Sequence, residues 1–275
     1  MTTRISQAFA TVKSEQRMAF MPFVTAGDPD MPATLELIRE FGRRGVDLIE
    51  IGFPYSDPIA DGPVIQASYT RALANGLHVA DIFAGIGSLK NEKNIPPLVA
   101  MVSYAIVFRN GPEQFFQKAK TAGFSGLIIP DLPGDEAAEI AALARANELD
   151  LVQLVAPTTP NDRAERILKA ASGFVYCISV AGTTGVREAL PEELQSQLRE
   201  LRKKTDLPLA VGFGISRPDQ VASLRGIADG VIVGSAVVRH LENVANGDAR
   251  GASLKSAIEK AGAFAGEMVA AVKAK

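Results

Sequence analysis

The chain has 275 residues, a length that fits either one large domain, such as a single α/β barrel, or two small ones. Hydrophobic residues make up 47% of the chain and charged residues 22%, a composition that excludes a disordered protein. The 29 Lys and Arg residues nearly balance the 31 Asp and Glu residues, for a net charge of −2, so we expect no nucleic-acid partner.

The first predicted element is a helix at about Thr3–Lys13. Charged residues at Lys13, Glu15 and Arg17 interrupt any apolar run in the first 20 residues, so we expect neither a signal peptide nor a membrane span. The expected location of the protein is therefore the cytoplasm.

From residue 19 onward, short apolar segments alternate with longer amphipathic ones at intervals of roughly 25 residues, as in repeated βα units. Strands such as GLIIPD and GVIVGS are hydrophobic almost without interruption, which indicates burial on both faces beneath covering helices. The sequence predicts eight strands, at Ala19–Thr25, Val46–Gly52, Pro97–Ser103, Gly126–Asp131, Asp150–Ala156, Gly173–Ser179, Pro208–Gly212 and Gly230–Gly234.

Amphipathic helices are predicted between the strands, and several of them begin near a proline. They are Pro32–Arg44, Pro112–Ala122, Asp135–Asn147, Pro160–Ala171 and Pro191–Lys203, followed by a long final helix at Ser253–Lys273. No linker or low-complexity segment divides the chain. The sequence therefore predicts one domain over residues 1–275, an α/β fold of the (β/α)8 TIM-barrel type with an extra N-terminal helix. An open doubly wound sheet is the alternative.

One predicted strand contains a carboxylate, and in such barrels the reacting groups lie where strands end. Alternation puts Glu50 on the same face as Leu48 and Gly52. If that face is the barrel interior, burial would raise the pKa of Glu50 and suit it to proton transfer. The alternative is a structural ion pair with a buried Arg or Lys. Two more carboxylates, Asp57 and Asp61, lie in the loop that follows.

Glycine-rich turns follow the sixth, seventh and eighth predicted strands, at Ala181–Gly185, Gly212–Ser216 and Gly234–Ser235. Glycine lets the backbone approach a ligand closely, and N–H groups at the start of a helix bind phosphate. The loops after strands seven and eight are the usual phosphate site of such barrels. These turns predict a phosphate site, with tight turns that need glycine for positive φ as the alternative.

Residue types that other barrel mechanisms need are missing. A Schiff-base aldolase needs a lysine on a strand, whereas every lysine here lies in or beside a predicted helix. A zinc-dependent aldolase needs several histidines, and His78 and His240 both fall in helical stretches. Cys177, inside the sixth strand, is interpreted as a small core residue. The sequence thus favours acid–base chemistry by carboxylates without a metal.

Together these segments closely resemble the α subunit of tryptophan synthase over nearly the whole chain. The resemblance rests on FMPFVTAGDP at the first strand, the run Glu50–Pro63, the LIIPDLP segment of the fourth strand and the paired GFGIS and GS turns. The run Glu50–Pro63 is the most specific, because it fixes two carboxylates eleven positions apart across a proline-bordered loop. The resemblance implies retro-aldol cleavage of indole-3-glycerol phosphate to indole and D-glyceraldehyde 3-phosphate, in L-tryptophan biosynthesis, with no metal or organic cofactor.

The resemblance also implies three catalytic residues. Glu50 corresponds to the mobile acid/base of the family, and Asp61 to the carboxylate that accepts the indole N–H and stabilises the cationic tautomer. Tyr176 corresponds to a family tyrosine near the reacting carbons, with a core tyrosine whose hydroxyl is satisfied as the alternative. Carboxylates suit this reaction because it requires proton transfer and stabilisation of a developing positive charge.

Substrate-binding residues follow from the same resemblance. The phosphate-binding residues are Gly185, Gly214, Gly234 and Ser235. The apolar walls around the indole are Phe23, Met101, Leu127 and Phe213, with ordinary core packing as the alternative. Thr184 matches a family threonine that closes over the site, and we expect the loops after strands two and six to act as lids.

Some positions depart from the family pattern. After the third strand the chain has Tyr104, Ala105 and Ile106, where the family often has an asparagine in a segment that touches the partner. In the loop after strand six, Val180 stands where an arginine is frequent and Thr183 replaces an aliphatic residue. These departures concern the interface and the lid.

The resemblance implies a partner, the β subunit of tryptophan synthase, in an αββα heterotetramer in which pyridoxal phosphate belongs to the β subunit. The expected contact surface is the loop with Pro54, Asp57 and Pro58 together with the segment after strand three. The alternatives are another phosphate-binding TIM-barrel enzyme or a non-catalytic binding subunit. The presence of both Glu50 and Asp61 argues against the second.

Overall fold

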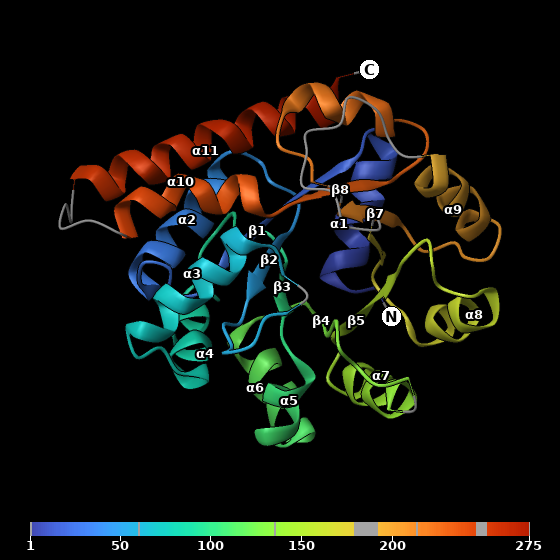
Figure 1. Ribbon diagram of the computed structural model, residues 1–275, viewed down its shortest axis with the longest axis horizontal. Helices are drawn as coiled ribbons and strands as arrows, with labels where there is room; N and C mark the ends of the chain where they lie inside the picture. Colours follow the sequence, from blue (N-terminus) through green and yellow to red (C-terminus); the bar gives the residue numbers. More distant parts are fainter. Residues whose placement is uncertain are drawn as a thin grey trace.

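Eight parallel strands close into a barrel in which each strand pairs with the next and β8 pairs with β1 (Figure 1). The computed structural model describes residues 2–59, 61–134, 136–178, 192–212, 214–245 and 252–274. The strands are β1 Ala19–Thr25, β2 Ile49–Gly52, β3 Leu98–Met101, β4 Gly126–Ile128, β5 Asp150–Val155, β6 Val175–Ile178, β7 Leu209–Gly212 and β8 Gly230–Val233. The predicted barrel is confirmed, and the open sheet is wrong.

Most strands are shorter than predicted, for reasons that lie in their flanking turns. The N–H of Val46 bonds to the carbonyl of Phe41, so this residue belongs to the turn after the preceding helix, and β2 begins only at Ile49. Strand β4 is shortened at its carboxyl-terminal end. It stops at Ile128 because Pro130 has no N–H to donate to the ladder.

Helices alternate with the strands and cover the outside of the barrel (Figure 1). The seven predicted helices are present, with described ends that lie within two residues of the predicted ones. The residues Asp135 and Pro191, where two of them were predicted to begin, lie outside the described part of the chain. The helices are α1 Arg4–Ser14, α2 Met31–Arg43, α3 Pro63–Ala74, α4 Val79–Ser88, α5 Tyr104–Arg109, α6 Pro112–Ala122, α7 Ala137–Ala146, α8 Asn161–Ala170, α9 Glu192–Arg202, the 3-10 helix η1 Pro218–Leu224, α10 Ser235–Ala245 and α11 Ala252–Lys273.

Local signals explain where several helices begin and end. The side chain of Asp30 accepts a hydrogen bond from the N–H of Ala33 and so caps α2, and Pro32 occupies the first turn. Helix α6 begins at Pro112 and is capped after Ala122 by Gly123, whose φ of 98° is in the left-handed region that glycine tolerates. The long α11 packs along α10 and α2 (Figure 1).

Hydrophobic side chains form two layers separated by the strands. The outer layer lies between strands and helices, and the inner core fills the barrel. Residues Ile5, Phe9 and Val12 of α1 belong to the inner core, where the rings of Phe9 and Phe174 lie 5.6 Å apart. Ile5 also approaches Gly126, the first residue of β4. Helix α1 therefore closes the amino-terminal end of the barrel, and the opposite end is left to the loops that follow the strands. No helix in the described ranges is long and apolar enough to cross a membrane.

Candidate active site

Glu50 points into the barrel from β2. Its register partner in β3 is Val99, a residue of the inner core, whereas its neighbours Ile49 and Ile51 pack in the outer layer. The side chain is buried, with 1% relative exposure, and neither carboxylate oxygen has a hydrogen-bond partner among the described residues. Burial raises the pKa of Glu50 to about 8. The predicted alternative, a structural ion pair, therefore finds no partner in the part of the chain that is described.

The loop between β2 and α3 brings Asp61 back over the barrel. The Asp61 N–H donates to the Pro58 carbonyl at 3.1 Å, and the Gln66 side chain donates to the carbonyls of Asp61 and Pro58 at 2.8 and 3.1 Å. These bonds tie the loop to the first turns of α3. Burial raises the pKa of Asp61 to about 6, and the nearby Tyr55 hydroxyl opposes this increase.

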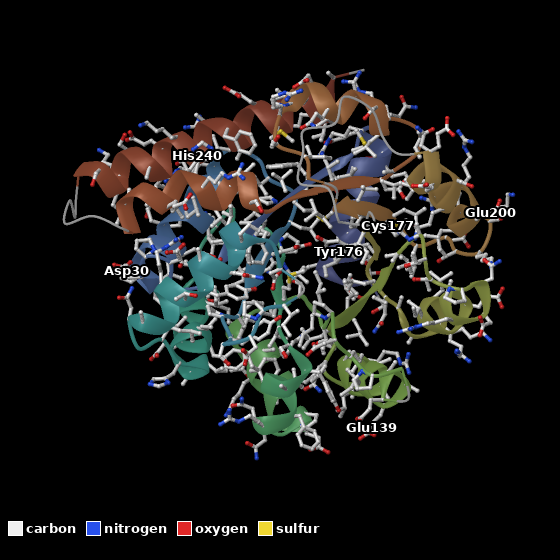
Figure 2. The ribbon with its side chains drawn as sticks, in the orientation of Figure 1. Asp30, Glu139, Tyr176, Cys177, Glu200 and His240 are labelled. Carbon is white, nitrogen blue, oxygen red and sulfur yellow. The ribbon has the colours of Figure 1, made fainter. Side chains whose placement is uncertain are left out.

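Two tyrosines accompany the carboxyl groups: Tyr69 is buried and Tyr176 is partly buried. Burial, followed by the charges of Glu50 and Asp61, raises the pKa of Tyr176 in β6 well above its usual range. The same causes, together with Tyr55, raise the pKa of Tyr69 in α3. Figure 2 shows Tyr176 near the centre of the molecule, whereas the labelled Glu139 and Glu200 lie at its edge. The structure therefore brings the three predicted catalytic residues, Glu50, Asp61 and Tyr176, into one site.

Tyr69 and Tyr55 are site residues that were not predicted from the sequence. Tyr55 lies inside the most specific run of the sequence, and Tyr69 lies four residues after Ile65 on the inner side of α3, so position and helical spacing were the available signals. Their rings lie 5.7 Å apart and are tilted by 53°.

Glycines on the inner faces of β2 and β7 make room for aromatic rings of the site. A Cβ on Gly52 would lie 2.3 Å from Phe23 Cζ and 2.8 Å from the Tyr69 hydroxyl oxygen. A Cβ on Gly212 would lie 2.4 Å from the Tyr176 hydroxyl oxygen. Both strand positions thus need a residue without a side chain, because an aromatic ring occupies the space above each.

Two of the predicted indole-pocket residues lie together. Phe23 forms a cluster with Tyr69 and Val238, against which Met101 and Ile65 also pack; we call these five residues the site cluster. The cluster is apolar apart from one hydroxyl and lies beside both carboxyl groups, as a pocket for an aromatic ring requires.

The prediction that Leu127 lines this pocket is wrong. Leu127 pairs in register with Ala100, and both belong to the outer layer beneath the helices. Its neighbour Ile128 pairs with Met101 and belongs to the inner core. A strand that is buried on both faces shows no alternation of polar and apolar residues, so the sequence could not indicate which face points inward.

The predicted phosphate-binding residues are partly described. Gly234 follows β8, and Ser235 is the first residue of α10, whose first hydrogen bonds run from Val237 and Val238 to the Gly234 carbonyl. A Cβ on Gly234 would contact Phe23, so this helix N-terminus adjoins the site cluster. Gly214 has φ of +43° and open space above it. Gly185, Thr184 and Phe213, with the departures Val180 and Thr183, lie outside the described residues.

Nothing in the described ranges resembles a metal centre, since no group of three or more His, Cys, Asp or Glu residues is placed to hold an ion. His78 lies directly before α4 and His240 lies in α10. Cys177 packs in the outer layer, and burial raises the pKa of its thiol to about 12. A thiol with that pKa is protonated at neutral pH, as expected for a core residue.

A closed (β/α)8 barrel with Glu50 and Tyr176 in its strands, and with Asp61 and Tyr69 in the loop and helix that follow β2, defines a barrel enzyme that works by acid–base chemistry. The family model of the tryptophan synthase alpha chain matches residues 9–273. The chain therefore belongs to the tryptophan synthase alpha chain family.

Relatives of known sequence and structure agree with this assignment. The tryptophan synthase alpha chain of Prochlorococcus marinus is 42% identical over 271 residues, which cover 98% of this chain and 97% of the relative. That of Carboxydothermus hydrogenoformans is 46% identical over 241 residues, 88% of this chain and 90% of the relative. Among solved structures, tryptophan synthase from Mycobacterium tuberculosis and its subunit alpha from Legionella pneumophila each cover 99% of both chains with a TM-score of 0.87, at 32% and 31% identity.

Proposed function

We propose that Glu50 and Asp61 carry out the retro-aldol cleavage of indole-3-glycerol phosphate to indole and D-glyceraldehyde 3-phosphate. This cleavage is the reaction of the tryptophan synthase alpha chain family, and the chain is a carbon–carbon lyase. The observation that carries this assignment of residues is the burial of the Glu50 carboxyl group. A carboxyl group that is buried with no hydrogen-bond partner among the described residues, beside a second carboxyl group, is costly to the fold and typical of an acid/base catalyst.

Glu50 is suited to moving protons in both directions. Cleavage needs a proton added at indole C3 and a proton removed from the glycerol hydroxyl next to the breaking bond. The hydroxyl then becomes the aldehyde carbonyl, and the electron pair of the broken C–C bond restores the aromatic indole. With its pKa raised to about 8 by burial, Glu50 is mostly protonated at pH 7 and can donate one proton, then accept the other.

Asp61 is suited to the charge that this proton transfer creates. Protonation at C3 places positive charge on the indole nitrogen, and a carboxylate that accepts the N–H stabilises that charge. The pKa of Asp61, raised by burial to about 6, still leaves the group mostly ionised at pH 7. The two carboxyl groups would therefore work in opposite protonation states.

The remaining site residues would position the substrate. Tyr176, partly buried and close enough to both carboxyl groups for their charges to raise its pKa, would lie near the reacting carbons. Phe23 and Met101 would contact the indole ring, with Phe213 completing the wall and Thr184 closing over it. Backbone N–H groups at Gly214, Gly234 and Ser235, together with Gly185, would bind the phosphate, which is supported by the helix N-terminus beside the site cluster.

The partner is the tryptophan synthase β subunit, and we propose an αββα assembly in which pyridoxal phosphate belongs to the β subunit alone. Two large hydrophobic side chains near the expected contact surface support it. Ile59, in the loop after β2, is 90% exposed, and Phe108, in α5 after β3, is 65% exposed. In this chain we propose neither a metal nor an organic cofactor, and the proposed location is the cytoplasm.

The release of indole from indole-3-glycerol phosphate tests the proposal. It is measured with and without β subunit for wild type, Glu50→Gln and Asp61→Asn. We expect indole from wild type and a loss of at least about a hundredfold in either variant. Glu267→Gln, which changes an exposed carboxyl group on α11, is the control. Undiminished release from Glu50→Gln would contradict its role. No release from any protein would favour a binding subunit, and activity on another phosphorylated substrate would favour a different barrel enzyme.

A further inference from the structure

The side-chain amide of Gln66 reaches back from α3 to the loop that carries Asp61. Its nitrogen Nε2 donates to the Asp61 carbonyl at 2.8 Å and to the Pro58 carbonyl at 3.1 Å. Both partners are carbonyl oxygens, which only accept hydrogen bonds, so the amide turns its nitrogen toward them and uses both of its protons there. Gln66 therefore holds two points of this loop with one group.

The two loop residues that Gln66 holds are also joined to each other. The Asp61 N–H donates to the Pro58 carbonyl at 3.1 Å. The backbone of Asp61 is thus held on both sides, through its N–H and through its carbonyl. With the backbone held, the Asp61 side chain has only a few staggered orientations to choose from. The contacts of the loop therefore decide where the Asp61 carboxyl group can lie.

Helix α3 is a firm base for this contact, because it is fastened to the end of β1. A buried hydrogen bond of 2.6 Å joins the hydroxyls of Ser68 and Thr25. One turn of helix further on, the Arg71 guanidinium donates to both carboxylate oxygens of the buried Asp28, at 2.9 and 2.7 Å. A bidentate pair fixes orientation as well as distance. Gln66 thus connects the loop to a helix that is itself anchored to the barrel.

The side chain of Gln66 is not needed by the helix. Its backbone N–H donates to the Gly62 carbonyl at 3.0 Å, as in any helical turn, and the side chain is only partly buried. Its two bonds to the loop are therefore what the amide adds. A side chain of equal length without donors should release the loop and leave α3 in place.

We propose that Gln66 is a positioning residue for Asp61: its amide holds the loop backbone so that the Asp61 carboxylate is presented to the indole N–H. The inference rests on the proposed role of Asp61. A loop that is free to move carries the carboxylate away from the indole nitrogen part of the time, and this lowers the population ready to react. A loop tied to an anchored helix avoids that loss.

The first test is Gln66→Met, which keeps the length of the side chain and removes both donors. We expect kcat for indole release from indole-3-glycerol phosphate to fall about tenfold, the size of effect that the loss of positioning hydrogen bonds has. KM should stay within about twofold of wild type, because the residues proposed to bind the phosphate and the ring are unchanged. Gln117→Met, which changes an exposed glutamine on α6, is the control and should match wild type.

The second test separates positioning from packing by repeating the change in an Asp61→Asn background. If Gln66 acts through the Asp61 carboxylate, Gln66→Met should cause no further loss once that carboxylate is gone. Single turnovers with enzyme in excess measure the small remaining rate. A loss of about tenfold in both backgrounds would assign Gln66 to packing alone and overturn the inference.

The other outcomes are equally decisive. Wild-type kcat in Gln66→Met, with Asp61→Asn strongly impaired, would overturn the role of Gln66 and leave the proposed function intact. A change confined to KM would assign Gln66 to substrate binding and would also overturn the inference. Full activity in Asp61→Asn would instead remove the proposed role of Asp61, and the inference with it.

Discussion

At the scale of single residues, Glu50 should destabilise the fold at the pH where it is catalytically useful. Burial raises its pKa from 4.5 to about 8, so between these values the unfolded chain has released a proton that the folded chain retains. Stability therefore falls as pH rises from about 4.5 to about 8. Glu50→Gln does not titrate and should gain stability relative to wild type over this range, on the order of a few kcal/mol. Urea unfolding at pH 5 and pH 8 measures this change.

Glu267→Gln, on the exposed side of α11, should unfold with the same pH dependence as wild type. If Glu50→Gln also followed wild type at both pH values, the carboxyl group would be ionised in the fold, and its proposed role as an acid would be untenable.

The carboxyl groups of Glu50 and Asp61 should together shape the pH profile of catalysis. Burial raises the pKa of Asp61 to about 6 and that of Glu50 to about 8. The reaction needs Asp61 ionised and Glu50 protonated, so kcat/KM should rise through about pH 6 and fall through about pH 8. Steady-state rates of indole release from pH 5 to 9 check this. Asp61→Asn should remove the acid limb in whatever activity remains, and a flat profile for wild type would contradict both assignments.

At the scale of elements, composition and periodicity were enough to locate all eight strands, because a strand buried beneath helices is a short apolar run between turn residues. They were not enough to orient each strand. β2 could be oriented because Glu50 interrupts its apolar run, whereas β4 carries no polar side chain within the strand, and Leu127 was placed on the inner face in error. Tyr69 was not predicted because no bounds were predicted for its helix, α3, although a helix after the second strand is part of the predicted βα repeat.

The close packing of Phe23 from β1 and Tyr69 from α3 over Gly52 gives a prediction at this scale. A methyl group on Gly52 would lie 2.3 Å from the Phe23 ring, which is buried and cannot move freely. Gly52→Ala should therefore cost about 1–3 kcal/mol of stability, as overpacked cores do. It should also raise KM for indole-3-glycerol phosphate, because the displaced ring belongs to the site cluster. Gly134→Ala, with nothing within 4 Å of the new methyl group, is the matched control. Equal melting temperatures for the two variants would contradict the packing argument.

At the scale of the whole molecule, the two ends of the barrel have separate tasks. Helix α1 closes the amino-terminal end, and Phe9 fills it against Phe174. Phe9→Ala should cost about 3 kcal/mol through the cavity it leaves. Because the carboxyl groups lie toward the other end, kcat/KM at 25 °C should match wild type while the protein remains folded. Thermal unfolding and indole release measure the two effects, and a loss of activity in the folded variant would show that the ends are coupled.

The segments that follow β2 and β3 carry the two most exposed large hydrophobic residues of the described ranges, and this gives a prediction about assembly. Ile59 and Phe108 follow the neighbouring strands β2 and β3, and an aromatic ring that is 65% exposed gains most when a partner covers it. Phe108→Ser should therefore raise the Kd for the β subunit by about tenfold or more. Its free energy of unfolding should change little, because the ring is already exposed.

Leu73→Ser, which changes a 36% exposed side chain near the end of α3, should bind as wild type does. Calorimetric titration with purified β subunit measures both constants. Equal values for the two variants would place the contact surface elsewhere on the barrel.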